Sequence, residues 1–268
     1  MKNEMKPIRT LDLSVDIDAP LETVWKALTE AEGIKNWFAP IVSVTKPGVG
    51  GEVTFGWSPE AVWPTTVDAW EPNKHLRWLN DDMMGPGTRL LCDYYLSTEG
   101  GKTRLRLVQS AFGASDGWDS FFEGTEAGWT YFLYNLRLYL EKHLGRVRHL
   151  ISNRFEVSAA RDVVWNNLLS ATAGLIITTG AAVKAGDWVQ LKLADPATLR
   201  AVVELVIDGH VLTMRIPELA DAVLFIELET GQGNFHVSSY LSVYDAKKAA
   251  EVEAPAQGAF ARVKAALQ

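Results

Sequence analysis

The stretch DGWDSFFEGTEAGWTYFLYNLRLYLEKHLG, residues 116–145, decides the fold because it has the pattern of one long amphipathic helix. Its large apolar residues recur at steps of three, four or seven positions and would form one stripe: Phe122, Trp129, Leu133, Leu136 and Leu140. Phe132 widens this stripe, and Gly145 can end the helix in a left-handed conformation. Burying such a face is worth on the order of 10 kcal/mol, so the helix needs a broad apolar partner surface.

The residues before this helix supply that surface as strands. Residues 8–18 alternate apolar and polar side chains with a period of two, and a helix from Leu21 to about Glu30 follows. Short Gly- or Pro-containing connections then separate several strands between residues 52 and 111, which predicts an antiparallel meander. We therefore expect an α+β fold in which a curved antiparallel sheet wraps around the long C-terminal helix.

The pattern restarts after residue 149, which predicts two domains, residues 1–149 and 150–268. The strand-to-helix segments beginning at Ile17 and Val157 align at an offset of 140, with Trp25 matching Trp165. Further strands and a helix over about residues 257–267 complete the second copy, and residues 251–257 are predicted to be linker-like. This last helix is expected to be much shorter than the first. Eight of the ten tryptophans lie in the first copy, so a ligand site is expected there.

Composition excludes several classes of protein. A 47% hydrophobic fraction, 22% charged residues and the absence of a long apolar run are typical of a soluble, cytoplasmic protein. The net charge of −7 and the lack of a concentrated basic face argue against a nucleic-acid partner. One cysteine, Cys92, precludes an internal disulfide, and no Cys/His group has metal-site spacing. We accordingly expect neither a metal nor a cofactor.

Five segments in order resemble the bacterial domain family related to the C-terminal domain of the activator of the heat-shock-protein-90 ATPase. They are residues 17–25, residues 37–40 (Trp-Phe-Ala-Pro), residues 70–78, residues 101–105, and the Gly128-Trp129 pair with its leucines. That family belongs to the START-like, or SRPBCC, superfamily, and the resemblance implies a helix-grip fold with a deep pocket between sheet and helix. The second half resembles the same superfamily more faintly, as a degenerate tandem copy.

Strand parity predicts which side chains face such a pocket. The alternation places Phe55 and Trp57 on one face, Trp78 on the next strand, and Cys92, Tyr94 and Gln109 on the two after it. The predicted ligand-binding residues are Phe38, Phe55, Trp57, Trp78, Cys92, Tyr94, Gln109, Phe122, Trp129 and Phe132. An aromatic chamber with few polar groups suits a small apolar ligand held by one or two hydrogen bonds.

Three functional hypotheses follow. Non-catalytic binding of a small hydrophobic ligand is the first, and a chaperone-linked stress-response or other protein-interaction role is the second. The third is an enzyme of the polyketide cyclase/aromatase type, in which Tyr94 or Gln109 would orient the substrate. The sequence offers little support for catalysis and no catalytic residue, because no histidine is expected in the chamber to form a Ser-His or Cys-His pair.

Overall fold

The computed structural model describes residues 9–82, 87–113, 118–169, 175–177, 182–193, 198–230 and 235–267. The chain divides into two compact units, residues 1–145 and 146–268. Each unit contains one seven-stranded sheet and a long C-terminal helix.

The first unit begins with a strand and two short helices and continues as a meander. Its elements are β1 (Arg9–Ile17), α1 (Leu21–Thr29), α2 (Ala31–Lys35), β2 (Ile41–Val44), β3 (Glu52–Ser58), β4 (Ala61–Glu71), β5 (His75–Asp81), β6 (Arg89–Glu99), β7 (Lys102–Phe112) and α3 (Asp119–Lys142). The strands pair antiparallel in the order β1-β7-β6-β5-β4-β3-β2. Only β1 is out of chain order, because it closes the sheet beside β7.

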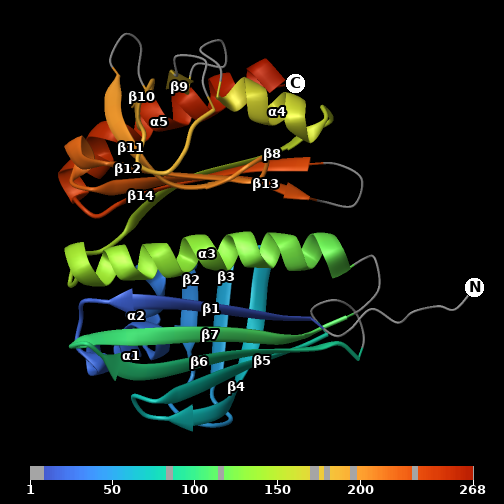
Figure 1. The fold of residues 1–268 in the computed structure, drawn as a ribbon, viewed down its shortest axis with the longest axis vertical. Coiled ribbons are helices and arrows are strands. Elements are labelled where there is room, and N and C mark those ends of the chain that lie inside the picture. Colours follow the sequence, from blue (N-terminus) through green and yellow to red (C-terminus); the bar gives the residue numbers. More distant parts are fainter. Residues whose placement is uncertain are drawn as a thin grey trace, which may run out of the picture. The chain divides into compact units, whose positions relative to one another are not determined.

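Helix α3 lies across the concave face of this sheet. Strands β1, β7 and β6 run nearly along the helix, whereas β2 and β3 cross it, so the sheet is curved (Figure 1). Four residues of the predicted stripe are buried: Trp129, Leu133, Leu136 and Leu140. The predicted helix start at Asp116 lies outside the described residues.

The second unit repeats this arrangement. Its elements are β8 (His149–Val157), α4 (Arg161–Leu168), β9 (Ile176–Ile177), β10 (Trp188–Leu191), β11 (Leu199–Ile207), β12 (Val211–Ile216), the 3-10 helix η2 (Pro217–Leu219), β13 (Ala222–Thr230), β14 (Phe235–Val243) and α5 (Ala246–Leu267). The sheet order β8-β14-β13-β12-β11-β10-β9 matches that of the first unit strand for strand. The predicted fold class, a tandem pair of α+β helix-grip folds, is therefore confirmed.

The repeat extends to the backbone hydrogen bonds. Strand β8 begins and ends 140 positions after β1, which is the predicted offset. In the first unit Gly50 N donates to Val67 O and Val67 N donates to Gly51 O. The second unit repeats this pair of bonds between residues 186–187 and Val203. The copies thus share strand register as well as element order.

The C-terminal helix differs from the prediction. It is 22 residues long, against 24 for α3, and it includes the predicted linker segment with Pro255 inside the helix. Its buried residues recur at steps of one, three or four positions: Ala249, Val252, Ala256, Ala259, Phe260, Val263 and Leu267. Packing of this continuous face outweighs the hydrogen bond that a proline removes from a helix. The predicted shortness of this helix and the linker were wrong.

Candidate functional site

The predicted chamber lies between α3 and the concave face of β3, β5, β6 and β7, and the Phe38 ring occupies its centre. The Phe38 ring centroid is 4.6 Å from that of Phe132, 5.1 Å from Phe55 and 5.3 Å from Trp57. It stacks nearly parallel to Trp129 at 5.4 Å, with an interplanar angle of 3°. Phe38 is 5% exposed, so the space expected for a ligand is filled by this side chain.

Phe38 is held there by the segment that joins α2 to β2. The adjacent Trp37 is fully buried, and its Nε1 donates to the carbonyl oxygen of Ala27 in α1 at 2.9 Å. The Trp37 carbonyl oxygen accepts from Asn135 Nδ2 of α3 at 2.6 Å. The backbone beside Phe38 is therefore anchored to two helices.

The sheet contributes rings through alternating positions of neighbouring strands. Phe55 and Trp57 come from β3, and Trp78 of β5 lies 6.0 Å from Phe55 in a stacked arrangement. Tyr94 of β6 packs edge-to-face on Trp78 at 5.0 Å and on Trp129 at 6.0 Å. The parity of the alternation therefore brings these rings together, as strand geometry requires.

Gln109 of β7 links the sheet to α3 at this site. Its Oε1 accepts a hydrogen bond from Trp129 Nε1 at 2.5 Å, and both side chains are buried. The indole N–H of Trp129 and the amide oxygen of Gln109 thus satisfy each other. This bond fixes the rotation of the Trp129 ring against which Phe38 stacks.

Two polar atoms of the chamber have no oxygen or nitrogen partner among the described residues. They are Trp78 Nε1 and the hydroxyl of Tyr94, on side chains that are 2% and 0% exposed, and the Tyr94 hydroxyl meets only the Cys92 thiol, a weak hydrogen-bonding group. Burial, together with the neighbouring Cys92 thiol, raises the pKa of Tyr94 well above its usual value, so the phenol stays protonated. Burial also raises the pKa of Cys92 to about 12, which keeps this thiol neutral and unreactive.

Phe122 is the predicted site residue that the structure places elsewhere. Its ring packs edge-to-face on Phe112 at 5.0 Å, and the guanidinium of Arg9 lies 4.8 Å above it. Phe122 shares the helical stripe with Trp129 but lies two turns nearer the start of α3. A shared helix face therefore did not imply a shared site.

Sequence reasoning missed one ring beside the chamber. Trp63 of β4 lies 5.8 Å from Trp57 and pairs across the strands with Phe55. Cross-strand partners place their side chains on the same face of a sheet. The sequence of the β3–β4 hairpin contains Trp63, but its position beside the chamber follows only once the pairing of Trp63 with Phe55 is known.

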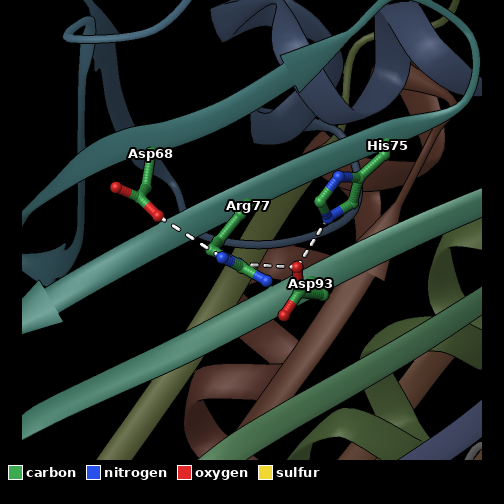
Figure 2. A network of polar contacts seen from close by, with 4 residues as sticks. All are labelled: Asp68, His75, Arg77 and Asp93. Atoms are coloured by element: carbon green, nitrogen blue, oxygen red, sulfur yellow. Dashed lines mark hydrogen bonds and ion pairs between the residues drawn. The ribbon is translucent and has the colours of Figure 1, made fainter.

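The outer face of the same strands carries a buried ionic network. Asp93 of β6 faces away from the chamber, yet its side chain is only 6% exposed. Its Oδ1 accepts from Arg77 Nε at 2.8 Å and lies 2.6 Å from His75 Nε2, while Arg77 also reaches Asp68 at 3.5 Å (Figure 2). The His75 ring stacks on Tyr95 at 4.5 Å and helps to cover the carboxylate.

The two neighbouring arginines on the outer face of β7, Arg104 and Arg106, are matched by acids. Arg106 donates to both carboxylate oxygens of Asp12, and Arg104 binds Glu99 at 2.6 Å. Within the part of the chain that the structure describes, no three His, Cys, Asp or Glu side chains form a potential metal group.

None of the helices in the described part of the chain combines the length and apolar character required to cross a bilayer.

Comparison with known proteins relates this geometry to a family. Residues 18–141 match the family model described as activator of Hsp90 ATPase homolog 1-like protein. The match extends from the end of β1 almost to the end of α3, and so includes the whole chamber. The family model thus matches most of the first unit and slightly less than half of the chain. The predicted resemblance is confirmed for this Hsp90-activator-like domain, whereas a comparison of the chain with curated proteins gives no match.

Solved structures similar to the chain are of one-domain and two-domain kinds. The solution structure of the Aha1 dimer from Colwellia psychrerythraea is 24% identical and covers 51% of this chain and 99% of its own, with a TM-score of 0.45. A Mesorhizobium loti protein is 27% identical over 49% of this chain and 96% of its own, with a TM-score of 0.43. The di-domain aromatase/cyclase BexL of the BE-7585A biosynthetic pathway is 12% identical over 96% and 94%, with a TM-score of 0.46.

Proposed function

We propose that the Hsp90-activator-like domain binds a small, mainly apolar molecule that carries one hydrogen-bonding group, in the chamber now filled by Phe38. The observation that carries this proposal is a pair of buried polar atoms, Trp78 Nε1, which has no partner in the described part of the chain, and the Tyr94 hydroxyl, which has only the weakly hydrogen-bonding Cys92 thiol beside it. The rings of Phe38, Phe55, Trp57, Trp129 and Phe132 would surround the apolar part of the ligand, and Cys92 and Gln109 would complete the lining.

The energetic argument concerns these two polar atoms. A buried polar group without a partner costs about 1–3 kcal/mol, so two of them are a burden in a domain that only needs to fold. A ligand oxygen that accepts from Trp78 and Tyr94 would remove this cost on binding. A phenol, ketone or carboxylic acid attached to an apolar skeleton has the required chemistry.

Binding on this scheme requires Phe38 to leave its position. The ring is held by contacts with at least four other rings, so the state with an open chamber is a minority. The apparent affinity of a ligand falls in proportion to the fraction of molecules in the competent state. Phe38 would thus set a threshold that only a ligand with good shape complementarity overcomes.

The alternative functions have less support. In a cyclase/aromatase-like enzyme Gln109 would orient the substrate, but its amide oxygen already binds Trp129. Tyr94 stays protonated and could donate to a substrate carbonyl, which ligand binding explains equally well. A chaperone-linked or stress-response role and a cytoplasmic location remain predictions.

Native mass spectrometry of gently purified protein, followed by denaturing extraction, tests the proposal directly. We expect a stoichiometric apolar compound, or, for a protein purified empty, heat of binding with members of a panel of small phenols and aromatic acids. Tyr94→Phe and Trp78→Phe should each weaken the binding of such a compound, by about tenfold per lost hydrogen bond.

The Phe38→Ala variant distinguishes two interpretations of the ring cluster, a ligand-binding chamber and a purely structural core. Removing the ring should cost roughly 3–5 kcal/mol of stability and at the same time raise the affinity for the apolar probe. Phe112→Ala is the matched control, because it removes a fully buried ring of the same domain outside the chamber. Equal binding by both variants and the wild type, or no binding by any of them, would reject the proposal.

A further inference from the structure

A second concave site lies in the first unit, between α1 and the turn that joins β4 to β5. It is a cavity of about 550 Å³, within the size range of small-molecule sites. Its lining includes Trp25 and Lys26 of α1, Glu30 at the end of that helix, Trp70 of β4 and Asn73 of the turn. None of the chamber rings around Phe38 lines it. Nothing in the proposed ligand-binding function uses it.

Two indole rings form one corner of this cleft. Trp25 and Trp70 have centroids 5.0 Å apart and an interplanar angle of 76°, so they meet edge-to-face. The edge-to-face arrangement leaves ring faces directed along two nearly perpendicular directions. The face of an indole carries negative electrostatic potential and attracts cations more strongly than the other aromatic side chains do.

Two hydrogen-bond acceptors of the cleft, on Asn73 and Glu30, have no side-chain donor in the described part of the chain. Asn73 has its Oδ1 buried without a partner among the described residues, and its backbone is in the left-handed region with φ +62°. The carboxylate of Glu30 has no ion pair or hydrogen bond with any described side chain, and it lies at the C-terminal end of α1.

The charged side chains that line the cleft also favour a cationic ligand. Glu22, Lys26 and Glu30 are the charged side chains of the cleft, which gives two acids and one base. The ammonium of Lys26 is 2.9 Å from the carboxylate of Glu22 and is neutralised by it. Lys26 also attracts Glu30 electrostatically, but two acids and one base leave the lining with net negative charge, which an anionic ligand would meet.

From these contacts we propose that the cleft binds a small organic cation with N–H donors, a primary alkylammonium or a guanidinium. The apolar stem would pack against the indoles, and the N–H groups would donate to Asn73 Oδ1 and Glu30. A neutral apolar molecule would leave both acceptors unsatisfied, which makes it the weaker occupant.

An isosteric series of three probes tests the charge preference in solution. Calorimetric titration of the full chain with 3,3-dimethylbutylammonium should show binding, and 3,3-dimethylbutanol, the neutral analogue, should bind at least tenfold more weakly. The anion 3,3-dimethylbutanoate should not bind. Equal binding of amine and alcohol would overturn the proposal in favour of a plain apolar cleft. Preferential binding of the carboxylate would overturn it in favour of an anion site at Lys26. The absence of binding by all three probes would also overturn it.

Three variants locate the binding in the cleft. Glu30→Gln removes the unpaired charge from an exposed side chain, so the fold should be unaffected while the affinity for the amine falls severalfold. Asn73→Gly removes the acceptor and keeps a residue that tolerates positive φ. Trp70→Leu removes one ring face. Glu32→Gln is the control, because this carboxylate pairs with Lys35 and does not line the cleft.

The outcome is independent of the chamber. Phe38→Ala should leave the amine affinity unchanged, and loss of amine binding in that variant would contradict two separate sites. Conversely, failure of the amine to bind would leave the chamber experiments unaffected.

Discussion

At the scale of single residues, Asp93 is the charged group whose surroundings matter most for stability. Its carboxylate is nearly buried and is shared by Arg77 and His75. Asp93→Asn keeps the shape but removes the charge, so Arg77 loses its closest compensation. We expect a loss of about 1–3 kcal/mol in the free energy of unfolding, measured by urea denaturation.

Asp12→Asn is the matched control for this change. Asp12 binds Arg106 through two short hydrogen bonds, but both side chains are about half exposed. Solvent screening limits such a surface pair to less than about 1 kcal/mol. Equal losses in the two variants would mean that burial of the Asp93 network contributes nothing.

Cys92 gives the protein a predictable response to alkaline pH. Burial raises the pKa of its thiol from 9.0 to about 12, so above pH 9 the thiol ionises in the unfolded chain before it ionises in the folded one. Ionisation then favours unfolding, and the stabilising effect present below pH 9 is lost as the pH rises towards 12. The free energy of unfolding should fall by at most about 1.4 kcal/mol per pH unit from this group.

The measurement compares the wild type with Cys92→Ala by urea denaturation at pH 8, 9 and 10. Other groups that titrate in this range affect both proteins and cancel in the difference. The stability of the wild type relative to the variant should decline as the pH rises. A difference that stays constant with pH would show that the thiol is not desolvated in the folded chain.

For single residues, the sequence predicted the direction of a side chain better than it predicted how deeply that side chain is buried. The alternation in β6 correctly separated Tyr94 from Asp93, because side-chain direction follows from strand geometry alone. It did not predict that Asp93 is buried on the outer face, since this depends on where Arg77 and His75 lie on the neighbouring strand. Phe38 was expected to line the chamber, but its ring fills the centre, which depends on how the α2–β2 segment packs against α3.

At the scale of elements, Pro255 is the feature of α5 with a testable cost. A proline inside a helix removes one backbone hydrogen bond and crowds the preceding turn, at a cost of up to about 3 kcal/mol. Pro255→Ala should therefore stabilise the second unit by about 1–2 kcal/mol, after subtraction of the entropy that proline removes from the unfolded chain. Slower hydrogen exchange of the α5 amides would report the gain locally.

Pro217→Ala provides the contrast within the same unit. Pro217 occupies the first position of η2, where its missing N–H has no helical partner to lose. This variant should bring no gain in stability. A Pro255→Ala protein that is no more stable than Pro217→Ala would indicate that α5 has fully adapted to its proline.

The elements that the sequence predicted well are those with a clear period. The stripe of α3 and the alternation of the strands gave type and approximate bounds. Helix α5 was predicted too short because three of its seven buried residues are alanines, which give a weak periodic signal, and because Pro255 suggested a break. The continuous buried face of α5 can be recognised only from its packing in the folded structure.

At the scale of the whole molecule, the internal repeat was predictable because the strand-to-helix segments of the two copies keep matching residues at an offset of 140 positions. Trp25 and Trp165, the matched residues of the two copies, are both buried. The chambers could not be compared in this way, since the core of the second unit is mainly aliphatic, with Phe155, Trp165 and Phe260 as its large rings. Duplication of a fold thus preserved its frame while the interior diverged.

This divergence has a practical consequence for spectroscopy. Of the ten tryptophans, those after residue 145 are Trp165, which is buried, and Trp188, whose side chain is 55% exposed. Intrinsic fluorescence of the intact chain therefore reports chiefly on the first unit, and far-ultraviolet circular dichroism reports on both. An unfolding transition that changes the dichroism but not the tryptophan emission can therefore be assigned to the second unit. This assignment needs no added fluorescent label.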